Sequence, residues 1–325
     1  MSPESGNPLP RIFMNSWFFF AKKYLFRLIK RIIRFAPWWV QDCLVFLYYF
    51  RRFPRLRNPI GFNEKVLYRK NRQFELSAFT ILADKYKVRQ YISDTIGAEF
   101  LVPLIFHSEH PVKPSDLKFG CDVIIKPNHC AGLYVIVPEI ADDFFINKIC
   151  NEVNKWLSID FSQVQRERHY SKIPPKILIE KLLGDGVQAP VDYKFHIFND
   201  TNGRVNYVLQ VIDDRFSGKI RRSFYVNSLE TVFCKEEGAG GIAVCSKLLA
   251  CALSKSLKLA AKFDYVRVDW YIHSGSLYFG EMTFTPAAGF GTGFGDELDY
   301  VMGRFWSMSS LDQLRVSTAG LERYN

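Results

Sequence analysis

The sequence lacks the cysteine and leader patterns of exported or zinc-binding proteins. Its 325 residues include seven cysteines, and no two of them have the two-residue spacing of a CxxC motif. An odd number without that spacing argues against a disulfide framework and against a structural zinc site, and it favours a reducing compartment. The first apolar stretch is dense in Lys and Arg and has no small-residue cleavage pattern, so no cleavable signal peptide is expected.

Internal repeats, low-complexity segments and the Walker A phosphate-binding pattern are missing as well. The composition is instead typical of a large folded core, with 48% hydrophobic and 16% aromatic residues, enough for two or three subdomains around one site. The net charge of +10 favours an anionic partner. Much of this excess lies in residues 1–57, which contain eleven Arg and Lys but only two Asp and Glu.

The basic N-terminal region predicts a helix with an apolar and a basic side. From Trp17 to Ala36, a helical projection gathers six Lys and Arg in one half of the wheel, although four bulky apolar residues interrupt that half. Such a helix suits an in-plane anchor on an anionic membrane surface. Residues 37–50 are apolar but fall short of the about 20 residues that span a bilayer, and they include Asp42, which favours an interfacial segment. The alternative is that both helices pack on the globular body.

Two prolines and a glycine between Phe53 and Gly61 predict a boundary before the main folded region. After it, the periodicity predicts amphipathic helices over residues 62–72 and 83–96 and an extended segment near residues 100–106. The second helix carries Lys85 and Arg89 on one face, and that face is expected to be solvated.

A β-hairpin is predicted over residues 265–284. Because side chains alternate along a strand, Arg267 and Asp269 share one face of the first strand, and Glu281 and Thr283 share one face of the second. Neighbouring carboxylates repel each other, so the pattern makes sense if a divalent cation lies between them and the guanidinium faces an anion. The phosphates of a nucleotide with magnesium would supply both. The alternative is an ordinary surface ion pair beside a solvated Glu281.

Two further segments have the character of a phosphate site and a nucleobase site. In Asp122–Val137, two β-branched runs flank a turn, and Lys126 ends the first run, so backbone amides and an ammonium could hold phosphate. The segment Pro175–Asp185 is predicted to be a strand that leads into a connector, and the connector's backbone groups, between apolar walls, could hold an adenine ring. A solvated lysine and a plain buried strand are the alternatives.

The order of these segments resembles the ATP-grasp superfamily of carboxylate-amine ligases. More closely, seven phrases between about residues 58 and 306 resemble the TupA-like, or teichuronopeptide-type, ATP-grasp family. They are Gly61–Lys65, Asp84–Arg89, Lys126–His129, Asp192–Phe195, Asp214–Phe216, Val266–Asp269 and Phe279–Phe284. The resemblance implies an α+β fold in which two α+β subdomains grip ATP.

Four parts of the chain are expected from this resemblance and from the N-terminal pattern. They are a helical membrane-associating segment over residues 1–57, an N-terminal subdomain over 58–118, an ATP-grasp lid over 119–188 and a C-terminal subdomain with the metal-binding hairpin over 189–325.

The resemblance also implies roles for single residues. ATP would be bound by residues of the lid, the connector and the next strand: Lys126, Asn128, His129, Gly132, Glu180, Lys181, Leu182, Leu183 and Asp192. Lys194 and Arg267 would be the catalytic side chains, and Arg267 would stabilise the transferring phosphoryl group. Magnesium would be held by Asp269, Glu281 and Thr283, where Thr283 stands in the place of an Asn ligand found in many ATP-grasp enzymes.

We therefore expect an ATP- and magnesium-dependent ligase that forms an amide through an acyl phosphate. By the resemblance, the carboxylate belongs to a uronic or other acidic sugar of a surface polysaccharide or its precursor, and the amine belongs to an amino acid or related compound. With the basic N-terminal segment, we expect a cytoplasmic protein attached peripherally to the inner face of the cell membrane. Nucleic acid is not an expected partner, because the cations cluster with bulky apolar residues on a helix.

Two alternatives of another class stay open. One is a glycosyltransferase of surface polysaccharide synthesis, for which Lys126 and the Glu180 connector would have no clear task. The other is a non-catalytic, membrane-associated nucleotide-binding protein.

Overall fold

The computed structural model describes residues 35–72, 76–184, 191–200, 202–213, 221–240, 242, 245–307 and 324. Contacts divide the chain into two units, Met1–Pro54 and Arg55–Asn325. In the first unit, the described residues form α2 (Trp38–Phe50). The predicted basic helix lies outside the described residues except for its last two positions. No helix within the described ranges is long and apolar enough to cross a membrane.

The second unit begins with helices that lead into two sheets. These are α3 (Phe62–Asn71), α4 (Leu76–Ala83), α5 (Val88–Ile96) and the short η1 (Ala98–Phe100). The expectation of one helix over residues 83–96 is wrong at its start, because Asp84 interrupts the helical pattern. Its Oδ1 accepts hydrogen bonds from the backbone N–H groups of Tyr86 at 2.8 Å and Lys87 at 3.3 Å, which favours a turn before α5.

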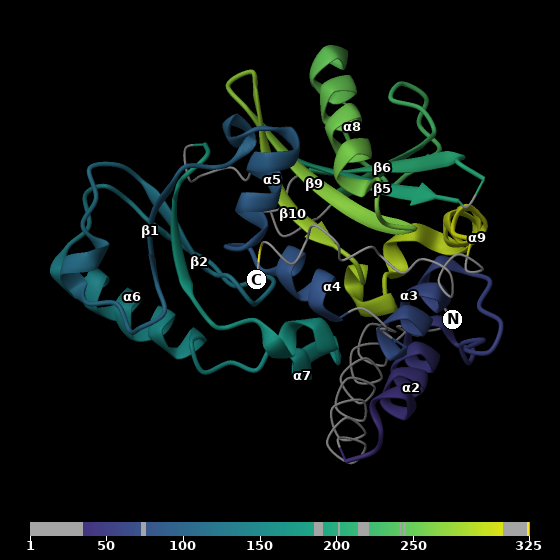
Figure 1. Cartoon of the computed structure of the whole chain (residues 1–325), viewed down its shortest axis with the longest axis horizontal. Coiled ribbons are helices and arrows are strands. Elements are labelled where there is room, and N and C mark those ends of the chain that lie inside the picture. The colour runs from purple at the N-terminus through teal and green to yellow at the C-terminus, as the bar shows by residue number, and fades with distance from the viewer. Residues whose placement is uncertain are drawn as a thin grey trace, which may run out of the picture. The chain divides into compact units, whose positions relative to one another are not determined.

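The smaller sheet has four antiparallel strands in the order β1-β4-β2-β3. They are β1 (Leu104–Ser108), β2 (Val123–Pro127), β3 (Val135–Val137) and β4 (Ile177–Lys181). One face packs on α6 (Asp143–Trp156), where Ile125 and Ile179 join Ile146 and Val153 in a core (Figure 1). The predicted boundary at residue 118 falls between β1 and β2, which belong to this one sheet. The short elements η2 (Pro114–Leu117), α7 (Ser162–Gln165) and η3 (Arg168–Lys172) complete this part.

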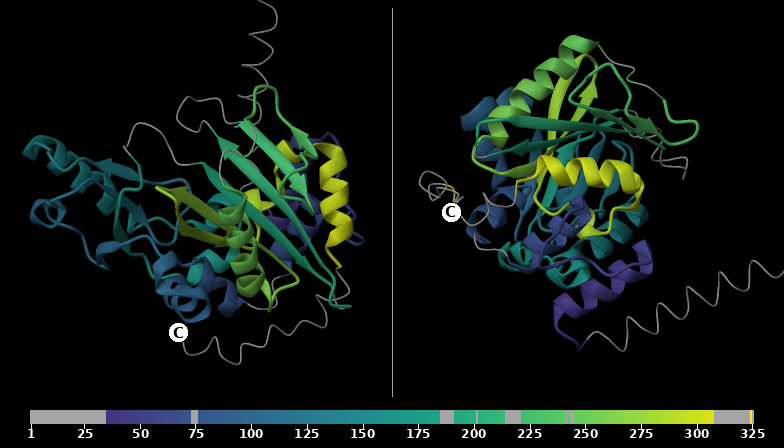
Figure 2. Two further views of the ribbon diagram at one scale, coloured as in Figure 1. Left: turned by 90° about the horizontal axis from the view of Figure 1, so that it is seen from above. Right: turned by 90° about the vertical axis from the view of Figure 1, so that its right-hand side faces the viewer.

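The larger sheet has six antiparallel strands in the order β10-β9-β5-β6-β7-β8. They are β5 (Asp192–Asn199), β6 (Val205–Asp213), β7 (Arg221–Val226), β8 (Cys234–Lys235), β9 (Tyr265–His273) and β10 (Ser276–Thr283). Helix α8 (Ser246–Ala260) covers one face, where its Leu249 and Leu259 pack with Phe195 and Val268. Figure 1 shows α8 beside β5, β6 and β9, and Figure 2 gives two further views of the same sheet. After β10 follow η4 (Pro286–Gly289), η5 (Thr292–Phe294) and α9 (Gly295–Phe305).

The predicted hairpin is present as β9 and β10, but it contains an extra residue. The register shifts between Phe279 and Met282, so that Gly280 and Glu281 both lie opposite Asp269. This is a β-bulge. Phe279 and Met282 are both buried, whereas strict alternation would put Glu281 on the same face as Phe279. The bulge therefore turns Glu281 onto the face of Asp269.

Gly280 gives the bulge the space that it needs. A Cβ atom at this position would lie 3.1 Å from Cε2 of Tyr271 and 3.2 Å from the backbone oxygen of Asp269. Gly280→Val is therefore expected to lower the free energy of unfolding by about 1–3 kcal/mol, as measured by urea denaturation. The matched control is Gly120→Val, because no atom lies within 4 Å of its Cβ position. An equal loss in both variants would contradict this account.

Candidate active site

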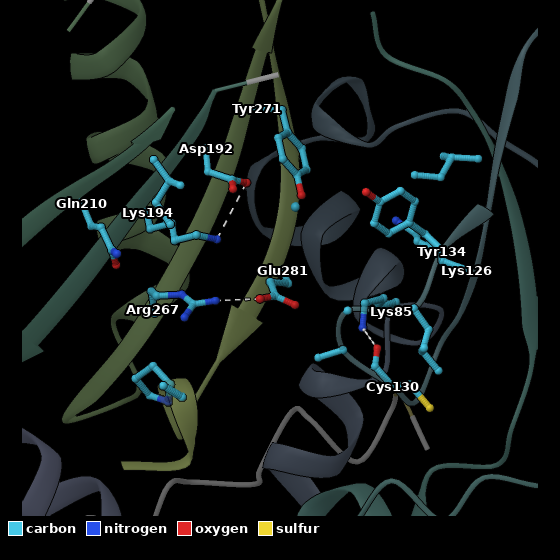
Figure 3. A pocket seen from close by; sticks show the side chains of 18 of the residues that line it. Lys85, Lys126, Cys130, Tyr134, Asp192, Lys194, Gln210, Arg267, Tyr271 and Glu281 are labelled. Carbon is cyan, nitrogen blue, oxygen red and sulfur yellow. Dashed lines mark hydrogen bonds and ion pairs between the residues drawn. The ribbon is translucent and has the colours of Figure 1, made fainter. Parts of the chain in front are cut away.

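A pocket of about 650 Å³ lies between the two sheets. The smaller sheet contributes Lys126 and Glu180, and the larger sheet contributes Lys194, Arg267 and Glu281. Figure 3 shows Lys194 and Arg267 on one side of this pocket and Lys126 on the other. Its volume falls in the range of sites for cofactors and small molecules.

An ionic network covers the larger-sheet wall. Arg267 donates from Nε and Nη2 to the two carboxylate oxygens of Asp269, at 2.6 and 2.8 Å, and from Nη2 to Oε1 of Glu281 at 2.6 Å. Lys194 lies opposite Asp269 in the register of β5 and β9, and its ammonium forms an ion pair with the same carboxylate. Asp269 is only 1% exposed. One buried carboxylate is thus shared by two cations.

The charges of this network determine which forms are ionised. Burial alone would raise the pKa of Asp269, but Arg267 and Lys194 outweigh it and hold that pKa below its ordinary value. Burial alone would lower the pKa of Arg267, but Asp269 and Glu281 hold it above its ordinary value. Both groups are therefore charged at neutral pH. The alternative of a surface ion pair is wrong, because the pair is buried at the edge of a pocket.

The smaller-sheet wall is held by a second ionic network. Glu180 pairs with Lys126 at 2.6 Å through Oε2 and with Arg89 at 3.2 Å through Oε1. Arg89 also donates to the backbone oxygen of Val102 at 2.9 Å. The ammonium of Lys126 thus lies at the pocket beside the carboxylate of Glu180, which comes directly before the predicted adenine-binding connector.

Lys85 is a pocket residue that the sequence did not reveal. Its ammonium donates to the backbone oxygen of Cys130 at 2.6 Å, and it lines the pocket near Lys126. Burial lowers the pKa of Lys85, while Glu281 acts in the opposite direction. The expectation that Lys85 and Arg89 lie on a solvated face is therefore wrong. Lys85 belongs to the turn before α5, where helical periodicity carries no information.

Asn128 and His129 do not line the pocket. Asn128 is fully buried, accepts a hydrogen bond from the backbone N–H of Lys176 at 2.7 Å and donates to Oδ1 of Asp84 at 2.9 Å. The ring nitrogens of His129 lie 3.1 Å from Oδ1 of Asn128 and 3.2 Å from the backbone oxygen of Ile159, and burial lowers its pKa. These two side chains hold the loop after β2 through hydrogen bonds on the side that faces away from the pocket.

The other predicted nucleotide-binding residues do line the pocket. They are Lys126, Gly132, Glu180, Lys181, Leu182, Leu183 and Asp192. The glycine-rich loop after the hairpin, which the sequence favours for close approach of backbone to substrate, also lines the pocket with residues 286–287 and 290–294. Lining residues that were not assigned a role from the sequence are Tyr134, Gln210, Arg222 and Tyr271. The two tyrosines carry no charge pattern, and only the fold brings them to the pocket.

The pocket offers oxygen donors to Mg²⁺, the ion that the resemblance implies. Mg²⁺ is commonly held by one or two carboxylates together with phosphate oxygens and water. Glu281 lines the pocket, and its Oε2 accepts no hydrogen bond from the described residues. Both oxygens of Asp269 are engaged by cations, and Thr283 donates its hydroxyl to Glu281 at 3.1 Å. Among the described residues, no three His, Cys, Asp or Glu form a ready metal cluster. Glu281 therefore fits a magnesium ion that is held mainly by nucleotide phosphates.

Two buried histidines predict a loss of stability in acid. His196 is fully buried between the hydroxyl of Tyr265 and Oε1 of Gln210, and His169 is 1% exposed. Burial lowers the pKa of each to about 3, below the value of about 6.5 in an unfolded chain. Their contribution to stability is complete above pH 6.5 and is lost as the pH falls toward 3, at about 1.4 kcal/mol per pH unit for each histidine.

Guanidinium denaturation at pH 7, 6 and 5 tests this prediction. His169→Gln is expected to reduce the pH dependence of the free energy of unfolding, whereas the exposed His110→Gln should leave it unchanged. The same slope in all three proteins would show that burial of His169 does not contribute to the loss.

Comparison with protein families decides the classification. The model of the TupA-like ATP-grasp family matches residues 64–306. The chain belongs to the TupA-like ATP-grasp family. The predicted family and the α+β ATP-grasp fold are both confirmed, and the matched range ends where the resemblance was expected to end.

The solved structures that are similar to this TupA-like ATP-grasp protein have low identity to it. D-Alanine-D-alanine ligase from Helicobacter pylori is 14% identical with a TM-score of 0.43, over 70% of this chain and 61% of that one. D-Alanine-D-alanine ligase from Bacillus anthracis complexed with ATP is 16% identical with a TM-score of 0.40, over 72% and 68%.

N5-carboxyaminoimidazole ribonucleotide synthetase from Thermus thermophilus is 14% identical with a TM-score of 0.37, over 63% of this TupA-like ATP-grasp protein and 46% of that chain. The chain thus spans less than two thirds of the Helicobacter and Thermus proteins. A search of curated proteins found no match.

Proposed function

We propose that this TupA-like ATP-grasp protein is an ATP- and magnesium-dependent carboxylate-amine ligase. The observation that carries the proposal is that charged side chains line both sides of one pocket. Lys85 and Lys126 line one side, and Arg267 and Glu281 line the other. Cations from both sheets suit a triphosphate, and a carboxylate beside them suits its magnesium ion.

In the proposed reaction, an oxygen of the acceptor carboxylate attacks the γ-phosphorus of ATP. The bond from that phosphorus to the bridging oxygen breaks, and ADP leaves with the electron pair. An amine then attacks the acyl carbon of the acyl phosphate, and inorganic phosphate leaves as the nitrogen loses a proton. The products are an amide, ADP and phosphate.

The protein's part is to position and neutralise charge, so no protein nucleophile is needed. Lys85 and Lys126 would bind phosphate oxygens, and Arg267 would stabilise the phosphoryl group during its transfer. Lys194 would hold Asp269 so that Asp269 orients Arg267. Magnesium bound at Glu281 would neutralise charge on the β- and γ-phosphates.

For the substrates, the family resemblance and the basic character of the chain support an acidic sugar of a surface polysaccharide, or its precursor, with an amino acid or related amine. The basic pattern of residues 17–50 supports peripheral attachment to the inner face of the cell membrane. This location would bring a cytoplasmic enzyme close to lipid-linked glycans.

A thermal-shift experiment with ATP and magnesium tests the proposal. A ligand that binds only the folded state stabilises it by about 4 kcal/mol when the ligand concentration is 1,000 times the dissociation constant. ATP with magnesium is expected to raise the melting temperature, and Lys126→Met should reduce that rise. The matched control is Lys118→Met, because the Lys118 side chain is 63% exposed on the outside of the smaller-sheet region.

The alternatives give other outcomes in the same experiment. Stabilisation by UDP-glucuronate or UDP-glucose, with none by ATP, would replace the ligase with a glycosyltransferase. Stabilisation by ATP without ADP formation, in mixtures of uronic acids and amino acids, would favour the non-catalytic nucleotide-binding protein.

A further inference from the structure

The turn that follows β10 is strained. In Pro286–Gly289, the consecutive residues Ala287 and Ala288 have φ angles of 48° and 52°. This left-handed conformation is unfavourable for residues with a Cβ atom and persists only where neighbouring groups hold it. Pro286 and Ala287 line the pocket, so the turn sets the position of part of the pocket wall.

One face of α3 holds this turn and the residues after it. Asn63, Leu67 and Lys70 follow the four- and three-residue spacing of a single helical face. Asn63 exchanges two hydrogen bonds with the backbone of Gly291, at 3.1 Å from its Nδ2 and 2.9 Å to its Oδ1. Leu67 packs against Gly289 so closely that a Cβ atom there would lie 2.9 Å from it.

Lys70 makes the contact with the strained residue itself. Its ammonium is buried and donates to the backbone oxygen of Ala288 at 3.0 Å and to that of Gln165 at 3.1 Å. It also lies 4.6 Å from the ring centroid of Phe290. Burying an ammonium costs free energy unless acceptor groups surround it. The Lys70 ammonium therefore favours the position of the turn in which the backbone oxygen of Ala288 remains its acceptor.

The same ammonium ties the turn to the segment between α6 and β4. Gln165 ends α7, and two residues later the carboxylate of Glu167 accepts a hydrogen bond from the hydroxyl of Thr285, directly before the turn. The turn is therefore fixed from two sides, by α3 and by the chain that returns to the smaller sheet.

We propose that Lys70 is a positioning residue for phosphoryl transfer. It holds Ala288 in its left-handed conformation and thereby orients the pocket-facing backbone of residues 286–291 toward the reacting groups. The catalytic consequence rests on the proposed ligase function, whereas the conformational role does not depend on it.

The test compares full-length protein with Lys70→Met by hydrogen-deuterium exchange and by ADP formation. Exchange of the backbone amides of residues 287–293 is expected to rise about 10-fold or more in the variant. The kcat for ADP formation, with glucuronate and a mixture of amino acids as probes, should fall about 10-fold, while the KM for ATP stays within about twofold.

A second substitution separates positioning from general damage. Glycine adopts the left-handed conformation without the steric cost of alanine. Ala288→Gly in the Lys70→Met background should therefore restore most of the lost kcat, because the turn then needs less support.

Lys65→Met is the matched control. Lys65 lies on the same helix, is also buried, and donates to the backbone oxygens of Gly303 at 2.7 Å and Trp306 at 2.6 Å, outside the pocket lining. This variant should lose stability without a change in the amide exchange of residues 287–293.

Unchanged exchange in Lys70→Met, an equal rise in Lys65→Met, or no rescue by Ala288→Gly would each overturn the positioning role. No ADP formation by the unsubstituted protein would contradict the ligase function instead, and the exchange comparison would still decide the role of Lys70.

Discussion

Arg267→Lys is expected to reduce ADP formation on the order of 1,000-fold, while ATP with magnesium still raises the melting temperature. The guanidinium of Arg267 reaches both oxygens of Asp269 and one oxygen of Glu281 at the same time. A lysine ammonium is a single point of charge and cannot keep that planar arrangement. The loss should therefore fall on transfer of the phosphoryl group more than on nucleotide binding.

Steady-state rates at saturating ATP measure this effect, with thermal shift as the binding readout. Arg204→Lys is the matched control, because Arg204 is exposed beside β6 and outside the pocket. A reduction of less than about 10-fold in Arg267→Lys would remove Arg267 from the reaction, since even one lost donor to a developing charge usually costs more.

Asp269→Ala is expected to lower the free energy of unfolding by about 3–5 kcal/mol. The substitution leaves the cations of Lys194 and Arg267 buried next to each other without the carboxylate that both contact. The pKa of Asp269 in the folded protein is held below its ordinary value. The carboxylate therefore stabilises the fold fully when the pH is above the ordinary pKa of an Asp, and this stabilisation is lost as the pH falls through the lowered pKa of the folded state.

Urea denaturation at pH 7 measures the change. Lys194→Met in the Asp269→Ala background should recover part of the loss, because it removes one of the two buried cations that lose this carboxylate. The matched control is Asp143→Ala, which breaks an exposed ion pair with Lys118 and should have no measurable effect. A loss of similar size in Asp143→Ala would show that burial of the network is not the cause.

The sequence predicted those parts of the site that depend on local pattern. Alternation within β9 puts Arg267 and Asp269 on one face, and the structure agrees. The bulge at Gly280 could not be predicted in this way, because an extra residue is defined only against its partner strand. The prediction put Glu281 on the same sheet surface as Arg267 and Asp269 with a cation between the carboxylates, whereas in the structure Arg267 itself contacts both. Alternation from the buried Phe279 would have put Glu281 on the other surface.

Residues next to the site in sequence were harder to predict than residues on its strands. Asn128 and His129 follow Lys126 closely, but β2 ends at Pro127 and their side chains turn to backbone groups behind the pocket. Lys85 was missed for the converse reason, since a turn brings it into the pocket from a distant part of the chain. The α+β fold was implied by the family resemblance, and periodicity predicted single helices and strands, whereas loop conformations depend on tertiary contacts.

The contact between Asn63 and Gly291 joins residues that are 228 positions apart in the chain. During synthesis at 5–20 residues per second, α3 leaves the ribosome roughly 10–50 s before the turn that it will hold. In that interval, the nascent chain carries Lys126 and Lys194 but cannot complete the pocket between them. A chain that stops before Pro286 would therefore carry Lys126 and Lys194 and lack the part of the pocket lining that residues 286–287 and 290–294 contribute, so the nascent chain completes this pocket only when α3 can contact that turn.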